Sequence, residues 1–308
     1  MISIIVTYYN TGWMLGRCLE SISEQTYDDY EVIVIDNGST DNSKYYVDDV
    51  ISMGKLKNCR YFRIDHTSKN EAINYGLDKV RGKYILFIDS AYDFVNINIL
   101  HYYYWAMITT SSDMVVGDYH EVRYNTRIKS ISNTPEDYHV MIVKKDRMIK
   151  CMHTPTAHSD VRYNNLWNKL FKADLFDTRR LSKDMGSEIT LIRDVVLQCD
   201  TMAIVPFELY YRASNVNIKL DMTIADAYQE RIDYLKNNFS IYNKKTLEGA
   251  QYLLLTNLVD IYRNNRDPEF RKQCAPILAD TYKKYFYCIP NNKRADFITR
   301  ICKKLLTK

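Results

Sequence analysis

A chain of 308 residues is long enough for one large domain or two smaller ones with their own apolar cores. The hydrophobic fraction of 46% and the charged fraction of 26% are ordinary for a globular protein, and a net charge of +4 is too small to indicate nucleic-acid binding. The seven cysteines include no CxxC pair, which argues against a zinc site and for reduced thiols in a cytoplasmic protein. Neither a signal peptide nor an apolar run of about 18 residues is predicted.

Strands and helices alternate through the first 90 residues. Continuous apolar runs, typical of strands buried on both faces, cover Ser3–Tyr8, Glu31–Ile35, Arg60–Ile64 and Tyr84–Asp89. Between them, apolar residues at helical spacing predict helices within residues 15–22, 46–51 and 72–80. This alternation predicts an α/β fold in which helices cover both faces of a parallel sheet.

In the remainder of the chain, the predicted secondary structure changes at about residue 213, from mixed strands and helices to helices alone. Before it, residues 113–117 indicate another strand and residues 119–129 a polar hairpin. Helices are predicted over Tyr163–Phe176 and Glu188–Cys199, and short strands over Met202–Val205 and Glu208–Arg212. After a linker-like stretch only helical periodicity remains. We therefore expect a sheet domain over residues 1–215 and a helical domain over residues 216–308.

Polar side chains follow three of the predicted parallel strands. They lie in Thr7–Asn10, Asp36–Asp41 and Asp89–Asp93. Open sheets of this kind bind ligands at the carboxyl ends of their strands. The three loops therefore predict one binding site at this edge.

Six segments carry a resemblance to a known family. In chain order they are VTYYN, QTYDDYEVIVIDNGSTDNS, NEAINYGLDKVRGKYILFIDS, NLWNKLFKADLF, IRDVVL and LYYR. In order and spacing, they resemble family 2 glycosyltransferases of the bacterial polysaccharide type, over about Met1 to Arg212. The resemblance implies the GT-A fold, a Rossmann-like, mostly parallel sheet. It also implies transfer of a sugar, with inversion, from a nucleotide-sugar such as a UDP-sugar to a glycan or lipid-linked glycan acceptor in surface glycan synthesis.

The resemblance assigns the nucleotide to two of the polar loops. Thr7, Tyr9 and Asn10 lie where the family packs the nucleotide. Asp36 and Asn37 lie where it contacts the uracil and ribose; the family commonly has two aspartates, so Asn37 keeps the hydrogen bonding and loses a charge. The alternative for this second loop is an Asx-rich turn that caps a helix.

The family segment SxxxxARNxG corresponds to residues 68–76, where Asn74 is kept and the arginine is replaced by Ile73. Lys69 is a candidate to contact phosphate in its place, because an ammonium reaches phosphate as a point charge. A solvated surface lysine is the alternative. Asp89 and Ser90, at the end of the next strand, complete the expected nucleotide site.

The stretch from Asp89 to Asp93 leaves the metal open. The family's DSDD supplies a carboxylate to Mn²⁺ or Mg²⁺, which bridges the diphosphate. Read without a gap, that carboxylate is Ala91, which cannot act as a ligand. Read with one inserted residue, it is Asp93, and the apolar pair Phe94-Val95 favours this register. We therefore expect Asp89 and Asp93 as metal ligands.

The resemblance places the general base at Asp194, which would take the proton of the acceptor hydroxyl. Its neighbour Arg193 replaces an acidic residue and would lower the pKa of Asp194 if the two touch. An ordinary ion pair on a helix surface is the alternative.

Other candidates have simpler explanations. His153, His158 and Asp160 could supply a metal ligand, but Pro155 excludes regular helical spacing, so a loop with incidental histidines is preferred. Trp167 is interpreted as a core residue.

The basic amphipathic segment from Thr281 onward predicts either a helix packed on the protein or a peripheral contact with the membrane surface. Two rival functions stay open for the whole chain. One is a non-catalytic relative that binds nucleotide or a partner enzyme. The other is a sugar nucleotidyltransferase, which would need a glycine-rich loop that TYYNTGWM does not provide.

Overall fold

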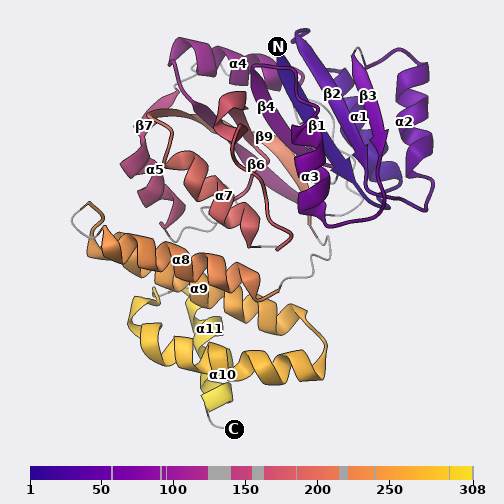
Figure 1. Ribbon diagram of the computed structural model, residues 1–308. Helices are drawn as coiled ribbons and strands as arrows, with labels where there is room; N and C mark the ends of the chain where they lie inside the picture. Colours follow the sequence, from indigo (N-terminus) through magenta and orange to yellow (C-terminus); the bar gives the residue numbers. More distant parts are fainter. Residues whose placement is uncertain are drawn as a thin grey trace. The chain divides into compact units, whose positions relative to one another are not determined.

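The computed structural model describes residues 1–56, 58–90, 92–94, 96–123, 140–154, 163–184, 186–214, 221–238, 241–290 and 292–306 (Figure 1). The chain divides into two compact units that are not contiguous in sequence. Unit 1 comprises residues 1–145, 165–183 and 194–216, and unit 2 comprises residues 146–164, 184–193 and 217–308. Among the described residues, no helix has both the length and the apolar character needed to cross a membrane.

Unit 1 is built on a nine-stranded sheet with the order β3-β2-β1-β4-β8-β6-β9-β5, and β7 pairs with β9. Its parallel part consists of β1 (Ile2–Tyr8), β2 (Tyr30–Asp36), β3 (Cys59–Arg63) and β4 (Tyr84–Asp89). Every residue of β1 and β2 is buried, which is why apolar residues predominate on both faces of these strands. The four predicted parallel strands are confirmed.

The remaining strands make the sheet mixed. They are β5 (Tyr92–Phe94), β6 (Met114–Arg123), β7 (Met141–Lys144), β8 (Lys169–Lys172) and β9 (Thr201–Ser214). Strand β8 runs antiparallel to both β4 and β6, whereas β6 and β9 are parallel. One continuous β9 replaces the two short strands predicted within residues 202–212. Of the hairpin predicted over residues 119–129, residues 119–123 continue β6 and the others lie outside the described residues.

The helix predicted over Tyr163–Phe176 is wrong. Residues 169–172 form β8 and residues 173–176 a 3-10 helix. Asn168 has a φ of 59°, which an α-helix cannot accommodate, and Leu170 and Phe171 are buried where β8 pairs with β4 and β6. A short apolar run fits either a helix or a buried strand, and the neighbouring strands decided this one.

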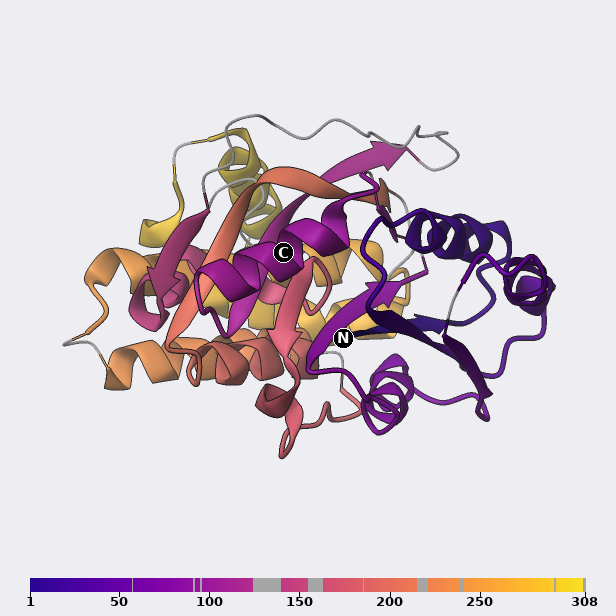
Figure 2. The ribbon, with the colours of Figure 1, turned by 90° about the horizontal axis from the view of Figure 1, so that it is seen from above.

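Helices cover both faces of the sheet, as predicted (Figure 2). Figure 2 shows α1 (Trp13–Ser23), α2 (Ser43–Ser52) and α4 (Ile99–Thr109) on one face and α3 (Lys69–Leu77) on the other. Helix α3 lies against β1 at Gly76, where an added Cβ would meet the Ile5 side chain at 2.6 Å. Glycine is therefore required there for close packing, and it fixes the position of α3 above the sheet.

Unit 2 is helical. It contains α5 (Lys145–Met152), the first part of α7 (Ser187–Val196), α8 (Thr223–Asn237), α9 (Lys244–Asn264), α10 (Pro268–Tyr285) and α11 (Lys293–Leu306). Arg231 is fully buried in it and donates hydrogen bonds to the Asn164 side chain and the Ile189 carbonyl. A buried guanidinium needs such acceptors, so Arg231 fixes α8 against these two segments.

Candidate functional site

The candidate site lies at the carboxyl edge of the parallel strands. Near the end of β1, Thr7 is in register with Ile35 of β2 on one side and with Asp89 of β4 on the other. The register therefore gathers the polar loops that follow β1, β2 and β4 at one edge of unit 1. Thr7 itself is 6% exposed.

Asp36 ends β2 with a carboxylate that is completely buried. The Ser39 amide donates to its Oδ1 at 2.7 Å. The Tyr61 hydroxyl and the Arg63 guanidinium donate to its Oδ2 at 2.9 and 3.2 Å. With three internal partners, Asp36 organises the loop after β2.

Asn37 holds that loop against the loop after β3. Its side-chain amide donates to the Thr67 carbonyl at 2.8 Å and accepts from the Thr67 amide at 2.9 Å. The adjoining Gly38 has a φ of 76°, and an added Cβ would meet the His66 amide nitrogen at 2.7 Å. The DNGS sequence is thus suited to a close approach of two loop backbones, which only glycine permits.

An aromatic platform lies at the end of β1. The rings of Tyr9 and His66 are stacked, with centroids 4.0 Å apart and planes 24° apart, and Tyr9 is 43% exposed. His66 Nδ1 is 3.0 Å from the Asn37 carbonyl, which fixes the imidazole. Asn10 accepts hydrogen bonds from the amides of Thr40 and Asp41, so it joins the loops after β1 and β2. The result is a fixed, exposed π surface of the kind on which bases stack.

A lysine and an aspartate form an ion pair at the end of β4. Lys69, at the start of α3, places its Nζ 2.7 Å from Asp89 Oδ2, and both side chains are partly exposed. The Ser68 side chain and Glu71 form a capping box that fixes this end of α3. The next residue in the chain after Asp89, Ser90, is 1% exposed, and its hydroxyl has no hydrogen-bond partner among the described residues.

Asp93 lies in β5 and pairs with Arg17 of α1. Burial raises the pKa of Asp93 to about 6, and the Arg17 guanidinium opposes that shift. Both carboxylates influence the Cys18 thiol. Burial is the main cause that raises the pKa of this thiol well above the usual range, and the charges of Asp93 and Asp89 add to the shift. Asp93 and Asp89 therefore act on the same buried thiol while each has its own cationic partner.

These residues do not fit a divalent cation held by the protein's own carboxylates. Asp89 is ion-paired with Lys69 and Asp93 with Arg17, and alanine, the residue at position 91, has no oxygen in its side chain. Within the part of the chain that the structure describes, no three His, Cys, Asp or Glu side chains are grouped as metal ligands. A hard cation prefers several oxygens, so it would have to displace one of the two ion pairs.

Asn74 joins α3 to the segment around Leu181. Its side chain exchanges two hydrogen bonds with the backbone of Leu181, at 2.8 and 3.0 Å. Lys183 follows with an ion pair to Glu71 at 3.1 Å. The two Asn74 hydrogen bonds fasten α3, and with it Lys69, to the 181–183 segment, whereas the Lys183–Glu71 pair is an exposed surface contact.

Asp194 lies in α7 with its side chain half-buried. Its neighbour Arg193 places its guanidinium 3.6 Å from Glu230. Trp167 is buried and stacks on Tyr92 with centroids 4.5 Å apart, which agrees with the core interpretation.

Of the histidine candidates, His153 is 2% exposed and donates from Nδ1 to the Ile149 carbonyl at 2.7 Å, so it is a structural residue. His158 and Asp160 lie outside the described residues, as do Ala91 and Val95.

Sequence reasoning missed four residues that the structure brings to this edge: Arg17, Tyr61, Arg63 and His66. Three of them lie on or just after β3. The polar residues after this third strand could have indicated that its loop also lies at the site. Arg17 gave none, because it lies on an amphipathic helix where a solvated arginine is ordinary.

Residues 3–153 match the family model described as Glycosyl transferase family 2. EpsH of Bacillus subtilis (strain 168), a protein named as a glycosyltransferase, is 27% identical over 88% of this chain and 72% of its own length. A Campylobacter jejuni protein named GalNAc(5)-diNAcBac-PP-undecaprenol beta-1,3-glucosyltransferase is 22% identical over 94% of this chain and 86% of its own. The match spans only 35% of GlyA and 39% of GlyG, two glycosyltransferases of Streptococcus pneumoniae.

Solved structures share the fold at low sequence identity. Residues 1–349 of S. aureus TarS in complex with UDP-GlcNAc give a TM-score of 0.59 at 16% identity, covering 96% of this chain and 83% of that one. The mannosyltransferase PcManGT from Pyrobaculum calidifontis, in complex with GDP-Man and Mn²⁺, gives 0.58 at 14% identity, covering 99% and 84%. The GT-A fold with a helical C-terminal region is thereby confirmed.

Proposed function

We propose that this chain, which belongs to glycosyl transferase family 2, transfers a sugar from a UDP-sugar to an acceptor hydroxyl with inversion at the anomeric carbon. The observation that carries the proposal is the Lys69–Asp89 ion pair at the end of β4. It puts a partly exposed ammonium at the sheet edge where α/β folds bind nucleotides. A diphosphate bound at this edge can accept hydrogen bonds from that ammonium.

The uracil and the diphosphate of the donor each have a candidate partner. The Tyr9–His66 stack offers its exposed face to the uracil. Asn10, Asp36 and Asn37 fix the surrounding loops, Asn74 holds α3, and Thr7 lies near the end of β1. Lys69 faces the diphosphate, and the Ser90 hydroxyl, which has no hydrogen-bond partner among the described residues, can donate to it.

The transfer needs three events at the anomeric carbon. The acceptor oxygen attacks from the face opposite the diphosphate and forms the new bond. The bond to the diphosphate breaks, and its electron pair leaves with UDP. Asp194 takes the proton from the acceptor hydroxyl, and the Lys69 ammonium offsets the charge that develops on UDP.

The acceptor is proposed to be a glycan or a lipid-linked glycan. The support is the Campylobacter jejuni relative, which is named for an undecaprenol-linked substrate and matches nearly the whole chain. The residues of the site do not discriminate between these acceptors.

A panel of UDP-sugars tests the proposal, with release of UDP measured in the presence and absence of glycan acceptors. Sugar transfer from at least one UDP-sugar is expected. A second candidate is a non-catalytic protein that binds nucleotide, which the internally paired Asp89 and Asp93 favour. Tight binding of UDP with no transfer and no donor hydrolysis would support that candidate instead.

A further inference from the structure

The loop between β3 and α3, residues 64–68, carries or adjoins two groups that are proposed to meet the donor. His66 lies within the loop and stacks on Tyr9, with ring centroids 4.0 Å apart. Lys69 follows the loop as the first residue of α3, and its Nζ lies 2.7 Å from Asp89 Oδ2. The position of this one loop therefore affects both the aromatic platform and the cation.

A single buried side chain, that of Asn37, holds the middle of the loop. Asn37 is 5% exposed, donates to the Thr67 carbonyl at 2.8 Å and accepts from the Thr67 amide at 2.9 Å. A backbone amide can only donate and a carbonyl can only accept, so these two bonds fix which way the Asn37 amide is turned. The side chain pairs with Thr67 in the way that the backbone of a neighbouring strand would.

The backbone of Asn37 ties the same loop to the end of β1. Its amide donates to the Tyr8 carbonyl at 3.0 Å, and its carbonyl accepts from His66 Nδ1, also at 3.0 Å. Tyr8 directly precedes Tyr9 in the chain. Asn37 is thus bonded on one side to the residue before one ring of the stack and on the other side to the second ring.

Few other hydrogen bonds hold this loop. Among the described residues, every hydrogen bond from the loop to a segment other than α3 goes to Asp36 or Asn37. The bond to Asp36 is donated by the Ile64 amide at 3.0 Å, where the chain leaves β3. At the other end, two side chains of the loop donate to Glu71. These last bonds connect the loop to the first turn of α3, the turn that begins with the proposed diphosphate cation.

The pairing with Thr67 requires an amide at position 37. The oxygen and the nitrogen of asparagine supply an acceptor and donors, whereas a carboxylate near neutral pH supplies only acceptors. An aspartate there would place a carboxylate oxygen against the Thr67 carbonyl oxygen, and the two would repel each other. Asparagine is therefore matched to this loop by its donor, independently of any ligand.

We infer that Asn37 is a positioning residue for the donor: it holds His66 and Lys69 at the spacing that UDP requires and makes no contact with UDP itself. The inference rests on the proposed function, since UDP is the ligand that these two side chains are proposed to meet. A loop that is already held in place does not have to be ordered when the ligand binds, and this preorganisation strengthens binding. The buried amide thus couples recognition of the base to recognition of the diphosphate.

Isothermal titration of Asn37→Ala with UDP tests the inference. The substitution leaves His66 and Lys69 in the chain and frees the loop. The Kd for UDP should rise by about 5- to 150-fold, the range that corresponds to two side chains that must be ordered on binding. In a chain that already carries Lys69→Met, the additional loss should be several-fold smaller, because one of the two positioned groups is absent. An undiminished loss in that background would mean that Asn37 contacts UDP directly and would overturn the inference.

Asn37→Asp separates positioning from direct contact. If the side chain at position 37 only accepted a hydrogen bond from UDP, a carboxylate would serve as well as the amide. Because a carboxylate cannot donate to the Thr67 carbonyl, we expect this variant to bind UDP at least about fivefold more weakly near neutral pH. Affinity equal to that of the unaltered chain would contradict the inference.

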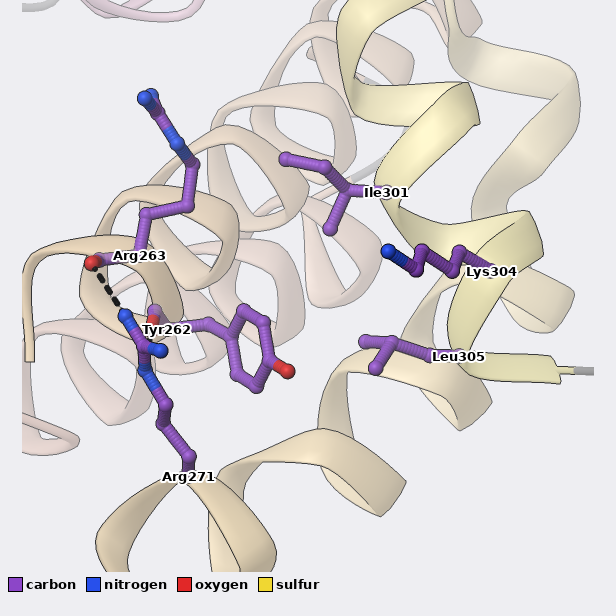
Figure 3. A pocket seen from close by; sticks show the side chains of 6 residues that line it. All are labelled: Tyr262, Arg263, Arg271, Ile301, Lys304 and Leu305. Carbon is purple, nitrogen blue, oxygen red and sulfur yellow. Dashed lines mark hydrogen bonds between the residues drawn. The ribbon is translucent and has the colours of Figure 1, made fainter. Parts of the chain in front are cut away.

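Arg271→Ala is the control for the loss of side-chain hydrogen bonds to the backbone elsewhere. Arg271 in α10 donates to the carbonyls of Tyr262, Asn265 and Arg263 at 3.1, 2.6 and 2.9 Å, and Figure 3 shows the bond to Arg263. The substitution should lower the free energy of unfolding and leave the Kd for UDP unchanged, because Arg271 takes no part in the proposed nucleotide site. If it raises the Kd as much as Asn37→Ala does, a general loss of stability is the cause and the inference is wrong.

Hydrogen exchange of the chain without ligand follows the loop itself. The Thr67 amide should lose protection in Asn37→Ala and keep it in Lys69→Met, because only the first substitution removes its acceptor. Equal protection in both variants would mean that Asn37 does not hold the loop. A chain that does not bind UDP at all would refute the proposed function together with the inference, whereas UDP binding that Asn37→Ala leaves unchanged would refute the inference alone.

Discussion

Lys69→Met tests the cation that is proposed to face the diphosphate. The substitution keeps most of the side-chain length and removes the ammonium that lies 2.7 Å from Asp89. Because Lys69 is 53% exposed and Asp89 29%, the ion pair itself adds only about 0–1 kcal/mol to the free energy of unfolding. The variant should therefore fold with nearly unchanged stability.

Binding of UDP should respond far more strongly. A hydrogen bond from an ammonium to a phosphate oxygen contributes about 1.5–3 kcal/mol, which corresponds to a Kd for UDP about 10 to 150 times higher in the variant. Uridine has no phosphate, so its affinity should not change. Isothermal titration with UDP and with uridine measures both quantities.

Lys183→Met is the matched control. Lys183 is also an exposed, ion-paired lysine, and its partner is Glu71 of α3. The Lys183→Met variant should bind UDP with the same Kd as the unaltered chain. The reasoning is refuted if Lys69→Met binds UDP as tightly as Lys183→Met. Titration in EDTA adds a second test, because binding that is lost with EDTA and restored by Mn²⁺ would support Asp89 and Asp93 as metal ligands after all.

Three further predictions concern other parts of the chain. Asp194→Asn should lower turnover by about 10²–10⁴-fold and leave UDP binding intact, and near-normal turnover in a transfer assay would place the base elsewhere. Asp36→Ala should weaken UDP binding and also lower the free energy of unfolding by about 1.5–3 kcal/mol, because Ser39, Tyr61 and Arg63 lose their acceptor; chemical denaturation measures this, and unchanged stability would contradict it. Burial, helped by the charge of Arg231, lowers the pKa of His153 to about 3. As the pH falls, the His153 imidazole is therefore protonated in the unfolded chain at a higher pH than in the folded chain. The contribution of His153 to the free energy of unfolding should therefore be constant above about pH 6.5 and should fall by up to about 1.4 kcal/mol per pH unit between there and about pH 3, so this part of the slope should be absent in His153→Gln.

Part of the candidate site could be predicted because its residues end buried strands. Asp36 and Asp89 each follow a run that must be a strand, so their place at one sheet edge follows from the parallel order alone. What each carboxylate does there could not be predicted in the same way. Asp36 accepts hydrogen bonds from three donors, and Asp89 forms an ion pair with Lys69. Whether these residues contact a nucleotide, and whether a domain boundary falls near residue 215, stay predictions.

By itself the sequence determined the elements with long, uniform patterns. The strands β1, β2 and β4 were predictable because a strand buried on both faces is apolar along most of its length, and the helices between the strands because one face of each meets the sheet. Only the tertiary structure decided what β8 is, since a run of four residues becomes a strand when neighbouring strands offer it hydrogen bonds. It also decided the charge pairs. Lys69 meets Asp89 across 20 residues and Arg17 meets Asp93 across 76, and the partner of a charge is set by distance in space, which a linear pattern does not contain.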